Sequence, residues 1–267
     1  MPPEPLIETE NLCRLFPERG GSFARRQFLR AVDGVSISVA PGETVAVVGE
    51  SGSGKTTLGR MLLGLLAPSS GEIRFRGKRL DGLHGDDRRE FRRAVQVVFQ
   101  DTGASLNPRQ SVGHSVALPL RWNLGLSAAE AASRAAALLD QVGLPAAQFA
   151  ARMPNALSGG QRQRVGIARA LASNPSLVVA DEPVSALDVS VRAQVLRLMR
   201  QIQAERGLAY LFITHDLGVV RAVADRVVVM YRGRVVEQGT ADAVLDRPAH
   251  DYTKALLAAT PIPEVRP

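Results

Sequence analysis

The fold of this chain is decided by the stretch Gly49-Glu50-Ser51-Gly52-Ser53-Gly54-Lys55-Thr56. A short β-branched segment, residues 43–48, comes directly before it and predicts a strand that is buried on both faces of a parallel sheet. After the stretch, apolar residues recur at helical spacing, at Leu58, Met61, Leu62, Leu65 and Leu66. Between a strand and a helix, glycines let backbone N–H groups turn inward around phosphate groups, and the helix dipole adds to the attraction. The stretch therefore predicts a nucleotide phosphate site.

Two side chains of this stretch have chemical roles of their own. In a loop of this kind the lysine, here Lys55, reaches the β- and γ-phosphates, and the hydroxyl of Thr56 ligates Mg²⁺. The alternative interpretation is a glycine-rich turn with a solvated lysine. The flanking strand and helix patterns favour the phosphate site, because a simple turn needs neither of them.

Length and composition indicate an ordinary globular protein. With 267 residues the chain can form one large domain or two small ones, and we expect one domain with an insertion. Hydrophobic residues make up 45% and charged residues 22% of the sequence. No window approaches the roughly eighteen consecutive apolar residues of a membrane span, and residues 1–5 lack the pattern of a secretory signal. A cytoplasmic location is expected.

Cysteine content and charge exclude other classes. The single cysteine, Cys13, rules out an intramolecular disulfide framework or an all-cysteine metal site, and we expect it to be a small buried apolar residue. The net charge of +7 is compatible with nucleic acid or an anionic surface. Because the arginines are scattered and aromatic residues make up only 4%, no nucleic-acid partner is predicted.

Strand and helix patterns alternate along the chain, which predicts an α/β fold with a mostly parallel sheet. In residues 101–157 the alternation of strand and helix patterns gives way to helical patterns, which predicts a helical insertion. Ser127 and Glu130 form a predicted capping box, and Gly143 is the predicted end of that helix. The predicted strands are 6–16 as an edge strand, 32–39, 43–48, 71–77, 95–99, 177–181, 209–214, and a hairpin over 226–237.

Two acidic residues follow the apolar strand at 177–181. Asp181 ends that strand and can hold Mg²⁺ with its water shell, while Glu182 can face the γ-phosphate and polarise an attacking water. Such a base need only orient the water and accept a proton late, because phosphoryl transfer depends mainly on positioning and charge compensation. The alternative for an isolated Asp-Glu pair is a helix cap.

A second glycine-containing helix start reads Leu157-Ser158-Gly159-Gly160-Gln161. It offers another helix N-terminus that can bind an anion. One bound nucleotide needs only one phosphate-binding loop from the same chain, however. The economical interpretation is that this turn faces a nucleotide bound to a second copy or a partner. The plain alternative is that Ser158 is only a helix N-cap.

With these segments in view, the chain resembles the ATP-binding subunit of an ABC transporter. The resemblance runs from about residue 6 to 260, in the order of the family motifs. The matching segments are Gly49–Thr56 (Walker A), Gln100 (Q-loop), Leu157–Gln161 (signature), Leu177–Asp181 with Glu182 (Walker B and catalytic glutamate), Ser185–Asp188 (D-loop) and His215 (switch histidine).

The resemblance extends to the subfamily that imports oligopeptides, dipeptides and nickel. It rests on Ala104–Arg109, Ala180–Val191 and, most discriminating, Pro248–Leu257. Thr102 and Asp251 replace prolines that are usual there. A C-terminal cysteine cluster found in some members is missing, which argues against an iron–sulfur cluster in this subunit.

The resemblance implies a P-loop NTPase (RecA-like) core with an antiparallel β subdomain and a helical subdomain. It places one nucleotide-binding domain at 1–260, with the core at about 1–100 and 158–240, the helical subdomain at about 101–157, and a tail at 241–267 that carries the subfamily motif. ATP and Mg²⁺ are the implied cofactors. The implied catalytic residues are Glu182, His215, Gln100 and Lys55, and the implied metal ligands are Thr56, Gln100 and Asp181. The implied nucleotide-binding residues are Phe16, Gly49, Glu50, Ser51, Gly52, Ser53, Gly54, Lys55, Thr56, Thr57, Ser158, Gly159, Gly160 and Gln161.

The family stacks adenine on an aromatic residue near the N-terminus. Phe16 matches by position, and Phe28 is a competitor because the loop from Pro17 to Gln27 separates Phe16 further than usual from the next strand. A core phenylalanine is the simpler alternative for each of them. His215 is implied to contact the γ-phosphate, although a lone histidine after a strand is usually structural.

The resemblance also implies an assembly. Two ATPase subunits, the second a related paralogue in our first choice, would close around ATP and drive two transmembrane permease subunits fed by an extracytoplasmic solute-binding protein. The chain would then lie peripherally on the cytoplasmic face of the inner membrane, with residues 101–157 facing the permeases. The alternative is a soluble ABC-type ATPase in phosphonate degradation or nucleic-acid repair.

Overall fold

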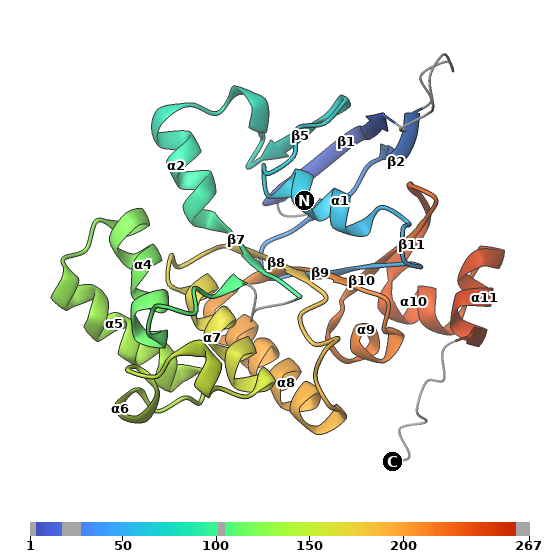
Figure 1. Cartoon of the computed structure of the whole chain (residues 1–267). Helices are drawn as coiled ribbons and strands as arrows, with labels where there is room; N and C mark the ends of the chain where they lie inside the picture. Colours follow the sequence, from blue (N-terminus) through green and yellow to red (C-terminus); the bar gives the residue numbers. More distant parts are fainter. Residues whose placement is uncertain (1–3, 18–27, 101–104, 260–267) are drawn as a thin grey trace, which may run out of the picture. The chain divides into compact units, whose positions relative to one another are not determined.

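The strand that leads into the phosphate loop is β4 (Thr44–Val48), and all five of its residues are buried, as the β-branched pattern predicts. The computed structural model describes residues 4–17, 28–100 and 105–259 (Figure 1). The chain divides into two units. The first contains residues 1–83 and 210–267, and the second contains residues 84–209.

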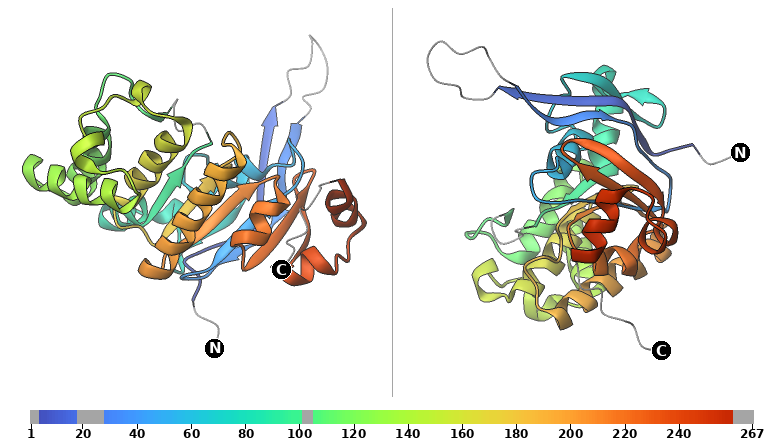
Figure 2. Two further views of the ribbon diagram at one scale, coloured as in Figure 1. Left: turned by 90° about the horizontal axis from the view of Figure 1, so that it is seen from below. Right: turned by 90° about the vertical axis from the view of Figure 1, so that its right-hand side faces the viewer.

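In the first unit, β4 lies between two parallel neighbours. The strand order is β11 (Arg234–Thr240), β10 (Arg226–Tyr231), β4 and β9 (Ala209–Thr214). Strands β10 and β9 run parallel to β4, and β11 pairs with β10 in the predicted hairpin. Helix α10 (Ala241–Asp246) and the start of α11 (Asp251–Ala259) lie beside this hairpin (Figure 2). Helix α9 (Leu217–Val223) follows β9.

The same unit holds an antiparallel sheet in the order β2-β1-β5-β6, in which β3 also pairs with β1. The strands are β1 (Ile7–Pro17), β2 (Phe28–Val35), β3 (Ser38–Val39), β5 (Ser70–Phe75) and β6 (Lys78–Arg79), followed by the 3₁₀ turn η1 (Leu80–Gly82). The expectation that residues 6–16 form an edge strand is wrong, because β1 is paired on both sides by β2 and β5. Alternation reports a half-buried strand and carries no information on how many neighbours it has.

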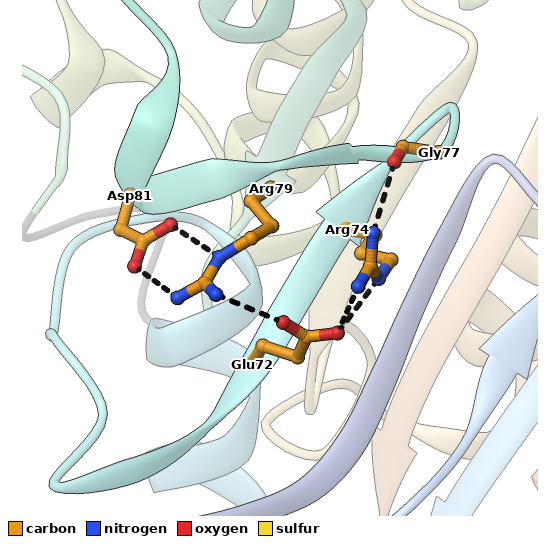
Figure 3. A network of polar contacts seen from close by, with 5 residues as sticks. All are labelled: Glu72, Arg74, Gly77, Arg79 and Asp81. Atoms are coloured by element: carbon orange, nitrogen blue, oxygen red, sulfur yellow. Dashed lines mark hydrogen bonds and ion pairs between the residues drawn. The ribbon is translucent and has the colours of Figure 1, made fainter.

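A charged network ties the end of the antiparallel sheet together (Figure 3). The carboxylate of Glu72 on β5 accepts from Arg74 and lies 3.3 Å from the guanidinium of Arg79. Arg79 also pairs with Asp81, at 2.8 Å. Because the side chains of Arg74 and Arg79 are 38% and 53% exposed, solvent screens the pairs and each contributes little to stability.

Helix α1 (Lys55–Leu62) is shorter than its sequence pattern predicts. Its apolar face is formed by Leu58, Met61 and Leu62, all fully buried. The chain leaves the helix at Gly64, whose φ is 66°, and Leu65 is 64% exposed. The last two members of the predicted apolar stripe therefore lie outside the helix.

The second unit combines two parallel strands with helices. Strands β7 (Val95–Val98) and β8 (Leu177–Asp181) pair in parallel, and α2 (Gly85–Ala94) precedes β7. The helical part contains α4 (Val112–Leu124), α5 (Ala128–Gln141), α6 (Ala146–Phe149) and the 3₁₀ turn η2 (Pro154–Ala156), and the long helices are α7 (Gly159–Leu171) and α8 (Val189–Arg206). The predicted capping box of Ser127 and Glu130 opens α5.

These elements confirm the predicted fold class, an α/β fold with a mostly parallel core sheet, an antiparallel β part and a helical part. Cys13 is half-buried, whereas full burial was expected, and its Sγ accepts a hydrogen bond from the Gly34 N–H at 3.1 Å in an exposed part of the sheet. Within the described residues, no helix has both the length and the apolar character to span a bilayer.

Candidate functional site

The phosphate loop lies where strand β4 gives way to helix α1. The loop backbone packs closely against neighbouring strands. One of the closest approaches is at Gly54, which precedes α1. Its φ is 104°, and a Cβ there would lie 2.1 Å from the carbonyl oxygen of Ala31 on β2. Only glycine fits this position, because both the backbone conformation and the space exclude a side chain.

Lys55 is buried inside this loop, with 6% of its surface exposed. Its Nζ donates at 2.7 Å to the carbonyl oxygens of Gly49 and Glu50, and it lies 3.4 Å from the hydroxyl oxygen of Ser53. A buried ammonium needs compensating oxygens, and here backbone oxygens supply them. Phosphate oxygens carry full charge and would attract the same ammonium more strongly. The lysine and the loop therefore fit a phosphate group.

His215 leaves the sheet beside the phosphate loop. The parallel register pairs Val48 of β4 with Thr214 of β9, so Gly49 and His215 both follow the carboxyl ends of adjacent strands. Ligands of parallel sheets bind at this edge. His215 is exposed, and the turn that carries it is held by the hydroxyl of Thr214, which accepts from the Asp216 N–H at 3.0 Å.

In the second unit, Gln100 and Glu182 come together. The Gln100 amide Nε2 donates to Glu182 Oε2 at 3.1 Å, although the two residues are 82 positions apart. Glu182 follows β8 with a φ of 48°, a left-handed conformation that is costly for a residue with a side chain. Ser185 holds this turn, because both its N–H and its hydroxyl donate to the Glu182 carbonyl. The fold thus fixes a carboxylate next to the glutamine amide.

The predicted metal ligands include a single carboxylate. Asp181 is the half-buried last residue of β8, and Thr56 is exposed in the first turn of α1. Among the described residues no group of three or more His, Cys, Asp or Glu could hold a metal by itself. A single carboxylate suits Mg²⁺, which is usually bound through one or two carboxylates and fills its shell with phosphate oxygens and water.

Helix α7 begins at the signature turn. The Ser158 hydroxyl accepts from the Gln161 N–H, and the Gln161 side chain accepts from the Ser158 N–H, which is a complete capping box. Gly160 is needed for packing, because a Cβ there would lie 2.3 Å from Cγ1 of Val191 on α8. The structure therefore shows the N-cap role of Ser158 directly. A role toward a nucleotide on another chain stays a prediction.

The D-loop residue Asp188 caps helix α8. Its carboxylate accepts from the Val191 N–H at 2.9 Å and from the Ser190 hydroxyl at 2.8 Å. These two hydrogen bonds, that from the Val191 N–H first, hold the pKa of Asp188 below its ordinary value, so the carboxylate is ionised at neutral pH.

The two candidate aromatic residues lie on opposite faces of the β1–β2 pair. Phe16 is the register partner of Leu29, and Phe28 is the partner of Pro17, so the side chains of Phe16 and Phe28 point to different faces. The Arg14 guanidinium covers the ring of Phe16 at 4.8 Å from the centroid. Phe28 is 52% exposed. The choice between them stays a prediction.

Sequence reasoning missed two contacts made by residues of the subfamily stretches. Tyr252 accepts a hydrogen bond from the Glu50 N–H of the phosphate loop, at 3.0 Å. Arg169 on α7 donates to the carbonyl and the hydroxyl of Ser105, at 2.7 and 2.9 Å, and burial lowers its pKa. The sequence marked these stretches as unusual and contained no signal for the partner of either.

A family model described as ABC transporter matches residues 32–185. The dipeptide transport ATP-binding protein DppF of Haemophilus influenzae is 49% identical over 257 residues, which are 96% of this chain and 78% of that protein. The glutathione import ATP-binding protein GsiA of Salmonella typhimurium is 50% identical over 261 residues, 97% of this chain and 42% of that protein. The chain thus spans less than half the length of this glutathione import relative.

Solved structures with the same fold include two cassettes. One is a dimeric, post-hydrolysis ATP-binding cassette bound to ADP and Pi, with a TM-score of 0.76 and 30% identity over 88% of this chain and 98% of that chain. The other is cbiO1 from Clostridium perfringens, part of the ABC transporter complex cbiONQ, with a TM-score of 0.77 and 29% identity over 91% of this chain and 92% of that chain.

Proposed function

We propose that this chain, which belongs to the ABC transporter family and is an ATP-binding and ATP-hydrolysing cassette of it, powers the uptake of a peptide or a peptide-like solute. The observation that carries the proposal is the 49% identity to a dipeptide transport protein, which extends over 96% of this chain. The similarity to glutathione import proteins favours the same solute class. Nickel stays an alternative cargo, supported only by the subfamily resemblance of Ala104–Arg109, Ala180–Val191 and Pro248–Leu257.

Within one subunit, the local geometry supports several of the proposed roles. Lys55 binds the β- and γ-phosphate oxygens, which is supported by its buried ammonium inside the loop. Mg²⁺, when bound by Thr56, Asp181 and Gln100, supplies charge compensation for the phosphate oxygens. The Thr57 hydroxyl and the backbone of Gly49–Gly54, apart from the Glu50 N–H that donates to Tyr252, add donors to the cradle.

Glu182 orients the attacking water and accepts its proton late in the reaction. The amide of Gln100, at 3.1 Å from the Glu182 carboxylate, supports this role because it restricts where the carboxylate points. His215 contacts the γ-phosphate, supported by its emergence beside the phosphate loop in the β4–β9 register.

The nucleotide site is shared between two subunits in this proposal. Ser158–Gln161 of one subunit complete the site of the other, where the start of α7 offers N–H groups and a helix dipole to the nucleotide. A similar cassette was solved as a dimer with ADP and Pi. We favour a paralogous partner over a second identical copy, as the subfamily resemblance implies.

The assembly also contains two transmembrane permeases, with a solute-binding protein acting outside the membrane and this subunit lying peripherally on the cytoplasmic face of the inner membrane. The helical subdomain at about 101–157 faces the permeases, and Gln100 links its motion to the nucleotide. The relatives named above are transport proteins, which favours this assembly over a soluble ATPase in phosphonate degradation or nucleic-acid repair.

The test is reconstitution with the permeases encoded beside the gene and their solute-binding protein. We expect co-purification from detergent-solubilised membranes and ATPase activity that rises when the binding protein is loaded with solute. Dipeptide, glutathione and Ni²⁺ are tested in separate arms, and Glu182→Gln serves as the inactive control. A complex that forms only with soluble proteins would overturn the importer assignment.

A further inference from the structure

The C-terminal stretch Pro248–Leu257 identifies the subfamily without having a chemical role in the proposed reaction. In the structure its helix α11 touches the phosphate loop. The Tyr252 hydroxyl oxygen accepts a hydrogen bond from the backbone N–H of Glu50, at 3.0 Å, across 202 positions of sequence. Glu50 is the second residue of the loop, so this contact reaches the nucleotide-binding segment directly.

With this contact, both polar atoms of the Gly49–Glu50 peptide group are held by side chains. The carbonyl of Gly49 and the N–H of Glu50 belong to the same peptide plane. Lys55 holds the carbonyl at 2.7 Å, and Tyr252 holds the N–H. When Lys55 turns to a phosphate oxygen, its bond to the Gly49 carbonyl weakens or breaks. Tyr252 then remains as the side chain that fixes the orientation of this peptide plane.

Tyr252 is itself held firmly in place. Its ring packs against that of Tyr231 on β10, with centroids 4.2 Å apart. Glu237 on β11 accepts from the N–H groups of Ala249 and His250, at 2.7 and 3.1 Å, and so anchors the chain just before α11. The Nδ1 atom of His250 accepts from the Tyr252 N–H at 3.1 Å. Burial raises the pKa of Tyr252, so its hydroxyl stays neutral at physiological pH.

We propose that Tyr252 is a positioning residue for ATP binding, which acts through the Glu50 N–H to keep the phosphate loop in its binding conformation. The C-terminal stretch therefore sets the affinity for nucleotide. This inference rests on the assignment of Gly49–Thr56 as the phosphate site. It predicts an effect on ATP binding and none on the chemical step, because Tyr252 contacts the loop backbone and no reacting group.

The test compares Tyr252→Phe with the matched change Tyr231→Phe in the full-length protein. Each variant loses one hydroxyl from the same ring pair, and only Tyr252 bonds to the loop. We expect Tyr252→Phe to raise the Kd and KM for Mg-ATP by about three- to tenfold, the range for one neutral hydrogen bond, with kcat at saturating ATP within about twofold. Tyr231→Phe is expected to leave all three values unchanged.

A readout independent of activity is amide hydrogen exchange over residues 44–57. We expect faster exchange at Glu50 in Tyr252→Phe and wild-type exchange in Tyr231→Phe. If Tyr252→Phe does not fold, Glu237→Gln replaces it, because it loosens the anchor of α11 without touching the loop, and a smaller rise in Kd is expected. A Kd unchanged in the folded variant, or a fall in kcat with Kd unchanged, would overturn the proposal. ATP binding that survives Lys55→Ala would instead refute the phosphate-site assignment.

Discussion

Replacing Gly54 by alanine tests whether the phosphate loop is shaped by close packing against β2. Gly54 and Gly52 both have left-handed backbones, with φ of 104° and 82°. A Cβ at Gly54 would lie 2.1 Å from the Ala31 carbonyl oxygen, whereas a Cβ at Gly52 would meet nothing within 4 Å. The pair Gly54→Ala and Gly52→Ala therefore separates the cost of a collision from the cost of backbone strain.

The expected magnitudes follow from these two terms. A left-handed backbone costs an alanine about 1–2 kcal/mol, and the lower entropy of the unfolded chain returns about 0.4–1 kcal/mol, so Gly52→Ala should lose about 1 kcal/mol. In Gly54→Ala the Ala31 carbonyl must also retreat from 2.1 Å to at least the 3.4 Å of ordinary contact. Overpacking of this kind costs about a further 1–3 kcal/mol. The total for Gly54→Ala is about 2–4 kcal/mol.

The assay is urea unfolding followed by circular dichroism in the absence of nucleotide, so that lost ATP binding does not enter the comparison. Isothermal titration with Mg-ATP then reports the site, and Gly54→Ala is expected to bind more weakly than Gly52→Ala. Equal losses of unfolding free energy in the two variants would refute the reasoning, since the collision with Ala31 would then contribute nothing.

Three further outcomes are expected. Glu182→Gln should retain ATP binding and lower hydrolysis by about 10² or more, as measured by steady-state phosphate release, and undiminished turnover would contradict the role of the carboxylate. Ser158→Arg should impair turnover at a wild-type partner's site in mixed dimers. Ser158→Ala removes only the cap, so it should lower the free energy of unfolding by about 1 kcal/mol and reduce turnover much less than Ser158→Arg does. At Glu237, burial by itself raises the pKa, but the hydrogen bonds from the Ala249 and His250 N–H groups bring it below the ordinary 4.5. The stability this carboxylate provides is thus complete above about pH 4.5 and is lost as pH falls through the lower folded pKa, so acid titration of Glu237→Gln should show a shallower loss.

Much of the fold follows from local pattern. The buried strand at 44–48, the hairpin at 226–237 and the capping box of Ser127 are all where the sequence predicts them. Each depends on residues that are close in sequence: β-branched runs, a turn with glycine, or a hydroxyl three residues before a carboxylate. Such patterns also predicted the phosphate loop, and the order of the motifs along the chain led to the family, which the comparisons confirm.

The errors arise where neighbours are distant in sequence. Strand β1 was expected at an edge and lies between β2 and β5, and Cys13 was expected in the core and lies half-buried with a hydrogen bond from Gly34. Alternation of apolar residues shows that one face of a strand is covered. It cannot show how many strands pair with its edges, because pairing is made by segments tens of residues away.

From the sequence alone came the prediction of a glycine loop that binds nucleotide, the prediction that Glu182 activates water, and the membership of the ABC transporter family, which the comparisons confirm. Only the tertiary structure decided that Gln100 bonds to Glu182 and that Tyr252 holds the Glu50 N–H. The physical reason is that a motif fixes local conformation, whereas a hydrogen bond across 82 or 202 positions forms only after strands and helices have packed.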